Sequence, residues 1–464
     1  MHARTLVSAA LAALLASSAA AQDAPFEVLV PHETPDVQTP VGDEARGVPM
    51  PTGSLGREVY RERRRALLQH LADTGGGIAL IRAADSIGKG DRQNLDFYYL
   101  TGIEHEAGAA LLLDPTAERF KERLFLKGLD VEDNVWHGER AKLGRAVELG
   151  TGIASVRRAG SLPSVLTQRL ANSEAKTLVY LGPIVPYTSP VPKTLSIYRD
   201  ATARVPGSKI TLDHRTLPAM RQAKTEAELA IMRRANDITL EGHRAAMRAV
   251  RPGMTEFELR LVFERAFQEQ GSYHLAYGPI CGSGPNSCIL HYRAGHRVMQ
   301  DGELVLCDVG CEVEMYASDI TRTFPVNGRF TPRQREVYEV VLRANEAAIA
   351  AVRPGVTMRE VDDAARSVIE SAGYTDDFMH GTSHFVGLYV HDAGLRDQPL
   401  VPGTVITIEP GIYLPDEHIG IRIEDQVLVT ETGSENLSAA LTKSVEGIER
   451  LMNAETEPQL SGAE

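Results

Sequence analysis

Basic residues are fewer than acidic ones in this sequence. Its 464 residues carry 49 Lys and Arg against 62 Asp and Glu, a formal net charge of -13. A nucleic-acid-binding surface needs clustered basic side chains that displace counterions from phosphates, so this deficit argues against one. Beyond the first residues the chain also lacks an apolar run of roughly 20 residues, the length that a membrane-spanning helix needs. These two absences leave a globular protein, and its length predicts two domains.

Cysteine and tryptophan are scarce as well, with four and one residues respectively. The spacing of Cys281, Cys288, Cys307 and Cys311 matches no zinc-binding framework. Three interpretations of the cysteines stay open, namely buried free thiols, one disulfide or a role in binding a metal.

The N-terminus is typical of an export signal. A short basic start is followed by an apolar run over residues 6–15 and by three alanines at 19–21, the small residues that signal peptidases accept. We therefore expect a signal peptide at 1–21 and a mature protein that is secreted or periplasmic and not embedded in a membrane. The alternative is an uncleaved membrane anchor.

Proline and helical periodicity divide the remainder of the chain. Prolines at 25, 31, 35, 40, 49 and 51 predict an extended arm over 22–54. A helical pattern at 58–71 and strand-like segments at 78–81, 97–100, 109–113 and 123–126 predict an α/β domain over 55–205. A capping box at 225–228 opens a long amphipathic helix in a second domain, expected over 206–455, before a disordered tail at 456–464.

The second domain contains an internal repeat. The segment 249–255, Ala-Val-Arg-Pro-Gly-Met-Thr, returns almost unchanged at 351–357. A strand that ends in Asp308-Val-Gly is echoed by one that ends in Glu409-Pro-Gly. Both echoes have a period of about a hundred residues, which predicts a duplicated domain whose halves face each other across a pseudo-twofold axis. Each half would then supply an acidic residue to a shared centre.

Acidic residues lie in the least polar segments of this domain. Asp308 ends an apolar run, Asp319 follows it at a separation that suits a hairpin, and Glu409 and Glu424 lie on strand-like segments. A charged carboxylate in such a place is costly unless it is paired or binds a cation. For a single acid, a hydrogen-bonded core residue or a surface ion pair is the more ordinary explanation. With His384, the four carboxylates form a hard, oxygen-rich ligand set that suits two divalent ions.

The sequence motifs around these residues resemble those of the pita-bread metallopeptidases, the family of aminopeptidase P, prolidase and methionine aminopeptidase. The resemblance covers about 55–452 and includes an aminopeptidase-P-type segment at 92–102. The motifs that carry it are Ile-Leu-His-Tyr at 289–292, Asp-Ile-Thr-Arg-Thr-Phe at 319–324, His-Gly-Thr-Ser-His at 380–384, Val-His-Asp at 390–392, Ile-Glu-Pro-Gly at 408–411 and Ile-Arg-Ile-Glu-Asp at 421–425. It implies an α+β chain with a C-terminal pita-bread catalytic domain.

The resemblance also implies roles for single residues. Asp308 would bind one ion, His384 and Glu409 the other, and Asp319 and Glu424 would bridge them. Manganese is the expected metal, with cobalt or zinc as alternatives. The two ions would lower the pKa of a shared water, so that hydroxide attacks the scissile carbonyl near neutral pH. Glu409 would move a proton, and His291 and His391 would stabilise the charge that develops.

The implied substrate is a peptide with proline in second position. His380, Tyr413 and Arg422 match positions that line the proline pocket, and Trp136 matches a segment that reaches a neighbouring subunit, which implies a homo-oligomer, a dimer or tetramer. A tryptophan buried in its own domain is the alternative for Trp136. The chain departs from its relatives at 293–296, Arg-Ala-Gly-His, where they tend to carry Asn or Glu.

Four functions are therefore to be weighed. An Xaa-Pro aminopeptidase is expected first, because Gly-Thr-Ser-His at 381–384 resembles that branch more closely. A prolidase-type Xaa-Pro dipeptidase is the alternative. A phosphotriester hydrolase of the prolidase branch would use the same ions. A binding protein that keeps the fold without hydrolysis would have lost metal ligands, and all five positions are filled in this chain.

Overall fold

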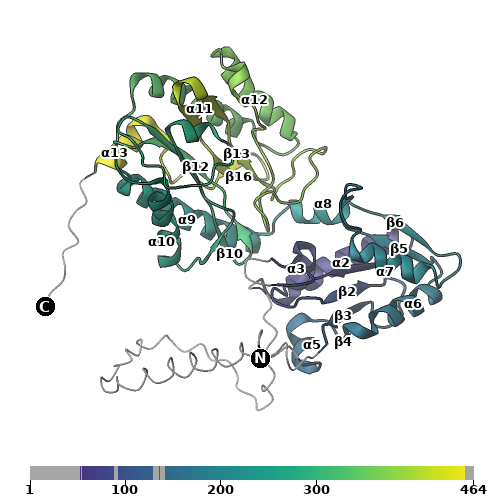
Figure 1. Cartoon of the computed structure of the whole chain (residues 1–464). Helices are drawn as coiled ribbons and strands as arrows, with labels where there is room; N and C mark the ends of the chain where they lie inside the picture. The colour runs from purple at the N-terminus through teal and green to yellow at the C-terminus, as the bar shows by residue number, and fades with distance from the viewer. Residues whose placement is uncertain (1–52, 54, 88–91, 129–134, 136–141, 455–464) are drawn as a thin grey trace, which may run out of the picture. The chain divides into compact units, whose positions relative to one another are not determined.

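A computed structural model of the chain describes residues 53, 55–87, 92–128, 135 and 142–454 (Figure 1). The expected signal peptide, almost all of the proline-rich arm, the tail at 456–464 and Trp136 lie outside these residues. Among the described residues, no helix combines the length and the apolar character that crossing a bilayer requires.

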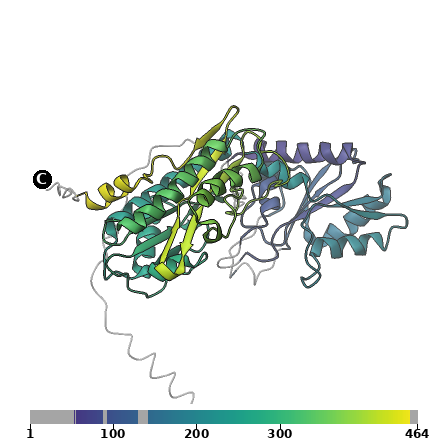
Figure 2. The same cartoon turned by 90° about the horizontal axis from the view of Figure 1, so that it is seen from above.

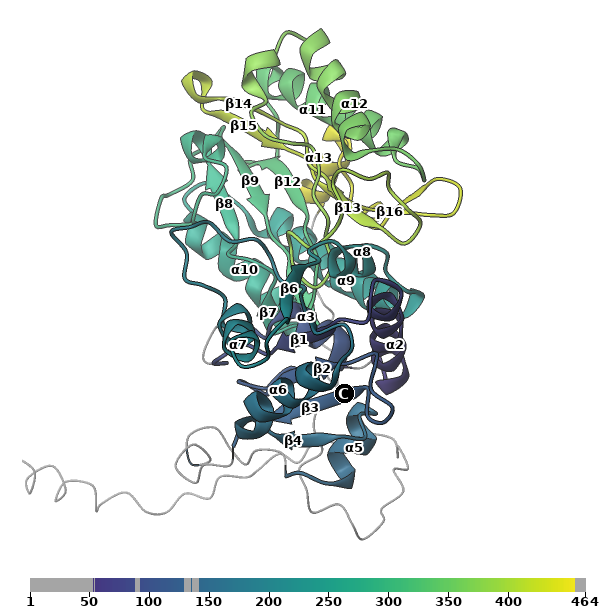
Figure 3. The same cartoon turned by 90° about the vertical axis from the view of Figure 1, so that its right-hand side faces the viewer.

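The N-terminal domain is built on one six-stranded mixed sheet, in the order β4-β3-β2-β1-β5-β6 (Figure 3). Its strands are β1 (Ile78–Arg82), β2 (Ala110–Leu113), β3 (Glu122–Leu126), β4 (Val156–Arg158), β5 (Thr177–Tyr180) and β6 (Lys209–Leu212). β1, β2 and β3 pair antiparallel, whereas β4, β5 and β6 each join the sheet in parallel. The edge strand β6 lies beyond the domain boundary expected between 205 and 206.

Helices cover both faces of this sheet. They are α2 (Arg57–Asp73), α3 (Leu95–Thr101), α5 (Arg145–Thr151), α6 (Leu162–Asn172) and α7 (Lys193–Thr202). Along β1 the side chains alternate, so that Ala79 and Ile81 pack with α2, α3 and α5, whereas Ile78 and Leu80 pack with α6 and α7. The helix predicted over 58–71 and the strands predicted at 78–81, 109–113 and 123–126 are thus confirmed.

The strand predicted at 97–100 is wrong, because these residues form helix α3. The Asn94 side chain caps the helix by accepting a hydrogen bond from the backbone N–H of Phe97. Gly102 ends it in the left-handed conformation, with φ of 70°. All four residues from Phe97 to Leu100 are buried. An apolar run buried on every side has no helical periodicity, which is why the sequence predicts a strand here.

The C-terminal domain places two pairs of helices against small antiparallel sheets. α9 (Glu226–Ala249) packs on α10 (Glu256–Glu269), and α11 (Pro332–Ala351) packs on α12 (Met358–Ser371) (Figure 2). Short α8 (Thr216–Gln222) precedes them and α13 (Val445–Asn453) follows. Each of the four long helices begins with a threonine capping box, including the one predicted at 225–228.

The strands of this domain repeat one pairing. β9 (Leu304–Asp308) pairs with β12 (Thr321–Pro325), and β13 (Val405–Ile408) pairs with β16 (Asp425–Val429). The remaining strands are β7 (His274–Leu275), β8 (Ile280–Ser283), β10 (Cys311–Val313), β11 (Tyr316–Ala317), β14 (Gly411–Leu414), β15 (Ile419–Arg422) and β17 (Ser434–Asn436). Asp308 therefore ends the first strand of one pair, and Glu409 directly follows the first strand of the other. The predicted duplication is confirmed.

Candidate active site

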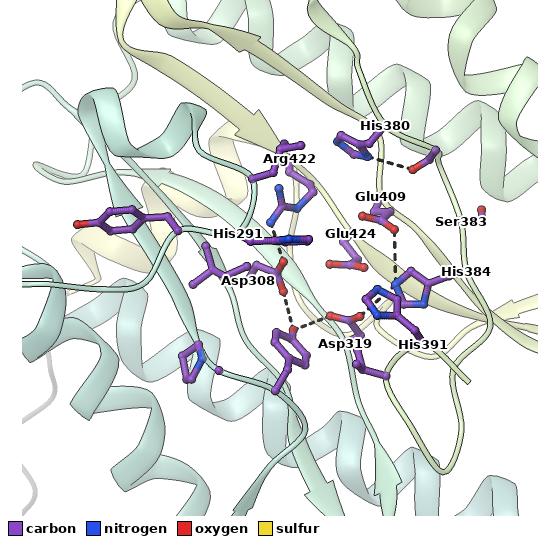
Figure 4. A pocket seen from close by; sticks show the side chains of 18 of the residues that line it. His291, Asp308, Asp319, His380, Ser383, His384, His391, Glu409, Arg422 and Glu424 are labelled. Carbon is purple, nitrogen blue, oxygen red and sulfur yellow. Dashed lines mark hydrogen bonds and ion pairs between the residues drawn. The ribbon is translucent and has the colours of Figure 1, made fainter. Parts of the chain in front are cut away.

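One cavity of about 760 Å³ opens between these strand pairs. Figure 4 shows that the side chains of Asp308, Asp319, His384, Glu409 and Glu424 point into the same space. His291, His380, His391 and Arg422 also line the cavity. Tyr413 does not line it, but its hydroxyl lies 2.9 Å from Nε2 of His380 and 2.8 Å from Nη1 of Arg422. Of the predicted site residues, Trp136 alone cannot be placed.

Three of the predicted metal ligands form a compact group. One ligand atom each from Asp319, His384 and Glu424 lies within 4.8 Å of the other two, and all three side chains are buried. Nε2 of His384 is 3.4 Å from Asp319 and 3.5 Å from Glu409. Its Nδ1 faces the carbonyl oxygen of Phe385 at 3.1 Å, which can only accept. This contact keeps Nδ1 as the donor and turns Nε2 toward the carboxylates, so that Nε2 would be free to bind a metal once the ring is neutral, the arrangement of a metal-binding histidine.

Two of the cavity carboxylates share the hydroxyl of a single tyrosine. The hydroxyl of Tyr277 lies 2.5 Å from Oδ1 of both Asp308 and Asp319. A hydroxyl carries one proton, so it can donate to only one of them at a time. The carboxylate that does not receive this proton needs another positive partner, and Arg422 offers one to Asp308 alone, at 2.6 Å from Oδ2.

Electrostatics leads to the same conclusion. Burial raises the pKa of Glu424 well above its usual range, and the nearby charges of Asp319 and Asp308 add to the effect. Burial also raises the pKa of Asp319 and raises that of Glu409 to about 7. Burial would lower the pKa of His384, but the adjacent carboxylates of Asp319 and Glu409 raise it to about 8. Divalent cations would supply the charge that these groups lack, so the ligand set fits two such ions.

A chain of hydrogen bonds joins the expected proline pocket to the carboxylates. It runs from His380 to Tyr413, on to Arg422, and from Nη2 of Arg422 to Oδ2 of Asp308 at 2.6 Å. Burial, with help from the nearby charge of Arg422, lowers the pKa of His380 to about 4. His380 is therefore a neutral ring at physiological pH, suited to stacking on an apolar pyrrolidine.

A buried ion network holds the loop that carries His391. Asp392 accepts hydrogen bonds from Arg221 and from the backbone N–H of Leu388, and Nζ of Lys224 lies 3.8 Å away. Arg221 also donates to Asp96 of the N-terminal domain at 2.7 Å. Residues outside the catalytic domain thus contribute to the position of a cavity histidine. Burial lowers the pKa of His391 to about 4, and the charge of His384 adds to this.

A second buried acid holds the loop of His291. Glu256 accepts hydrogen bonds from Ser283, Asn286 and the hydroxyl of Tyr292, which is the next residue after His291. These contacts are with neutral groups, in contrast to the cations around Asp392.

Sequence reasoning missed several residues of the site. Tyr277 has no sequence signal beyond its place before a Gly-Pro pair, since a lone tyrosine is common in cores. Asp392 lies in the predicted Val-His-Asp motif, but its partners Arg221 and Lys224 are remote in sequence. Arg260, Arg293 and Arg396 also line the cavity and were given no role.

Comparison with known proteins identifies the family. The model of metallopeptidase family M24 matches residues 230–431, and the model of the aminopeptidase P N-terminal domain matches 60–180. An Xaa-Pro aminopeptidase of Escherichia coli (strain K12) is 36% identical to this chain, over 86% of it and 98% of the relative. The chain belongs to metallopeptidase family M24. It is thus a metallopeptidase, a hydrolase that uses divalent metal.

Other M24 proteins agree in fold. A zinc-substituted E. coli aminopeptidase P in complex with product has a TM-score of 0.78 and 34% identity, over 87% of this chain and 99% of that one. A human Xaa-Pro dipeptidase is 30% identical over 89% of this chain and 95% of its own length. The M24 relatives therefore include both an aminopeptidase and a dipeptidase, and the predicted pita-bread architecture with its N-terminal domain is confirmed.

Proposed function

We propose that this chain is an Xaa-Pro aminopeptidase, which releases the first residue of peptides with proline in second position. The observation that carries the proposal is the cavity itself, where five ligand positions converge beside the linked side chains of His380, Tyr413 and Arg422. Proline has no N–H and a fixed φ, so enzymes that bind substrate as a strand exclude it. A site for its bond must be shaped around the ring, and a neutral His380 at the pocket wall serves this.

The ligands we assign are Asp308, Asp319, His384, Glu409 and Glu424. When bound, two divalent ions supply a Lewis acid for the scissile carbonyl and a water of lowered pKa. One imidazole with four carboxylates favours manganese over softer metals, with cobalt or zinc as alternatives. Removal of metal by a chelator and reactivation with each ion in turn, followed by elemental analysis, identifies the metal.

The chain's own residues do the rest. His291 and His391 lie on two different loops that line the cavity, and they donate N–H groups toward the negative charge that develops on the carbonyl oxygen. His391, with its lowered pKa, is neutral at physiological pH and keeps one nitrogen as a donor. The carboxylate of Glu409 holds a proton for the proline nitrogen, which must be protonated to leave. The acidic cavity floor attracts the free ammonium of the substrate.

The test compares matched substrates with and without manganese. We expect higher kcat/KM on Xaa-Pro-Xaa tripeptides and longer peptides than on Xaa-Pro dipeptides, and no turnover after N-acetylation. The segment 392–398 is too short for an obvious lid, which favours an open cleft. Faster hydrolysis of the dipeptide would assign the chain to the dipeptidase branch instead. Preference for a phosphotriester, or no hydrolysis at all, would refute both.

We also propose that the protein works as a homo-oligomer in which Trp136 reaches a neighbouring cleft. The support is the resemblance of the segment around Trp136 to its relatives. A monomer in light scattering at micromolar concentration with full activity would contradict this.

We further infer that residues 1–21 are a cleaved export signal and that the mature chain is secreted or periplasmic. The basic start, the apolar run at 6–15 and the alanines at 19–21 support this. N-terminal sequencing of the protein from extracytoplasmic fractions should find Gln22 first.

A further inference from the structure

The cavity has charges of opposite sign at its floor and around its wall. Four carboxylates, those of Asp308, Asp319, Glu409 and Glu424, form the floor. The same cavity is lined by three arginines that the mechanism does not use, Arg260, Arg293 and Arg396. These arginines differ in charge both from the acidic floor of the cavity and from the protein as a whole, whose net charge is -13.

Among the residues that the structure describes, two of these arginines have no acidic partner. Nε of Arg260 donates to Glu264 at 2.5 Å, four residues along its own helix. Arg293 and Arg396 are exposed and form no ion pair with any residue that the structure describes. Both guanidinium groups are therefore available to a ligand in the cavity.

Two acids near these arginines in sequence, Asp397 and Glu303, are already engaged in ion pairs with other residues. Asp397, the neighbour of Arg396, forms a two-pronged ion pair with Arg215 at 2.9 and 3.0 Å. Glu303 pairs in the same way with Arg297, at 2.6 and 2.7 Å. These acids would have to give up other partners before they could neutralise Arg293 or Arg396.

The backbone beside each free arginine is anchored. On one side of Arg293, the hydroxyl of Tyr292 donates to Glu256 at 2.7 Å. On the other, the carbonyl oxygen of Gly295 accepts from the backbone N–H of Phe257 at 2.9 Å. The backbone N–H of Leu395, next to Arg396, donates to the side chain of Gln222 at 2.9 Å. These hydrogen bonds thus fix the backbone position of each arginine, which reduces the conformational entropy that is lost when a ligand binds.

We propose that Arg293 and Arg396 form a subsite for a carboxylate that lies downstream of the proline in the substrate. This inference rests on the proposed function, because it concerns the same cavity. An acidic floor draws in the substrate's ammonium, and cationic side chains repel it, so the peptide enters amine first with its downstream part beside the arginines. Guanidinium groups bind carboxylates with charge-assisted hydrogen bonds. The favoured substrates are peptides with an acidic residue directly after the proline, or tripeptides with a free C-terminal carboxylate.

The experiment uses two matched substrate pairs at saturating manganese. Ala-Pro-Glu-amide against Ala-Pro-Gln-amide tests a side-chain carboxylate, and Ala-Pro-Ala against Ala-Pro-Ala-amide tests a terminal one. We expect kcat/KM to favour the acid of at least one pair by about fivefold, the strength of a good exposed ion pair. The pair that shows the preference identifies the source of the carboxylate. Raising the ionic strength should reduce it.

Variants then assign the preference to the arginines. Arg293→Ala and Arg396→Ala should each lower the ratio of acid to neutral kcat/KM, and Arg293→Glu should bring it below one. Arg343→Ala is the matched control, since Arg343 is an exposed arginine on α11 outside the cavity. Equal rates on both members of each pair in the unaltered protein, or a ratio unchanged in Arg293→Glu, would overturn the subsite while leaving the aminopeptidase intact. No turnover of any substrate would refute the proposed function and the subsite with it.

Discussion

The two halves of the catalytic domain share a frame and differ in their loops. Gly253 in the first half and Gly355 in the second both have positive φ, 89° and 86°. Their backbone N–H groups donate to the carbonyl oxygens of Met299 and Leu400, at 3.0 and 2.9 Å. The same turn thus links the two helices of each pair, and its hydrogen bond ties it to the segment that precedes the first strand of the strand pair. Duplication has preserved backbone geometry that any L side chain at these glycines would strain.

One buried polar residue of each long helix has diverged. His243 on α9 and Asn345 on α11 occupy equivalent places in the repeat. Nε2 of His243 contacts the carbonyl oxygen of Ile320, next to Asp319, at 3.0 Å. The side-chain amide of Asn345 donates to Ile408 and Ile423, next to Glu409 and Glu424. Each half therefore holds its ligand strands from behind, with different chemistry.

The loops differ more. The second half carries three of the four cavity histidines and the proline-pocket residues, whereas the first supplies His291, Tyr277 and Arg293. The comparison teaches that the repeated strand pairs carry or adjoin the four proposed carboxylate ligands, whereas the proposed ligand His384 and the proposed catalytic residues His291 and His391 lie on loops. Four predictions test this division.

Replacing a proposed metal ligand of either half should have the largest effect on activity, and the effect should be similar for the two halves. We expect Asp319→Ala and Glu424→Ala each to lower kcat/KM by about a thousandfold or more, because several kcal/mol of charge stabilisation disappears with the ions. Elemental analysis should show loss of metal in both. Asp363→Ala, at an exposed acid on α12, is the control. Two ions per chain in Asp319→Ala would refute the shared site.

The buried acids that hold the His391 and His291 loops, Asp392 and Glu256, should differ in how much they contribute to the stability of the protein. Asp392→Asn would leave the buried Lys224 without its carboxylate partner and Arg221 with Asp96 alone, at a cost of about 3 to 5 kcal/mol in unfolding free energy. Glu256→Gln, whose partners are neutral, should cost less. Chemical denaturation measures both. Because Asp392 acts through His391, Asp392→Asn should change kcat/KM little further in a His391→Ala background, and full additivity would exclude that role.

We expect the buried His243 of the first half to make the stability of the protein depend on pH. Asn345, its counterpart in the second half, does not titrate. Burial lowers the pKa of His243 to about 3, so between about pH 6.5 and 3 the unfolded chain binds a proton that the folded chain does not. Stability is therefore lost as pH falls through this window. His243→Asn, which copies the second half, should lose about 2 kcal/mol less between pH 6.5 and 5. Urea unfolding with chelator present measures this, and parallel pH profiles would contradict it.

The smallest effect should be symmetric. Thr255 and Thr357 cap α10 and α12 through almost identical hydrogen bonds, at 3.1 and 3.2 Å to the backbone N–H three residues on. Each Thr→Ala substitution should therefore cost about 1 kcal/mol. Thermal unfolding of the two variants should agree, and a clear difference would show that the repeat has diverged in its frame as well.

Much of the fold and of the candidate site can be predicted, because short stretches of sequence determine these features. The capping box at Thr225, the repeated Arg-Pro-Gly turn and acids at strand ends are short patterns with a physical cause. They correctly predict the start of α9, the duplication and the convergence of Asp308 with Glu409. The strand predicted at 97–100 is wrong because a helix that is buried on all sides shows no helical periodicity of apolar residues in its sequence. Tyr277 and the partners of Asp392 were missed because their significance arises only from contacts between residues far apart in sequence.

The position of Arg221 and Lys224 matters to anyone who shortens the chain. A cut just before the capping box at Thr225 follows the visible repeat, yet it removes both cations and leaves Asp392 as a solitary charge in the interior. A cut before α8 keeps them but separates Arg221 from Asp96. A minimal catalytic fragment would thus have to be redesigned at Asp392 before it could be trimmed.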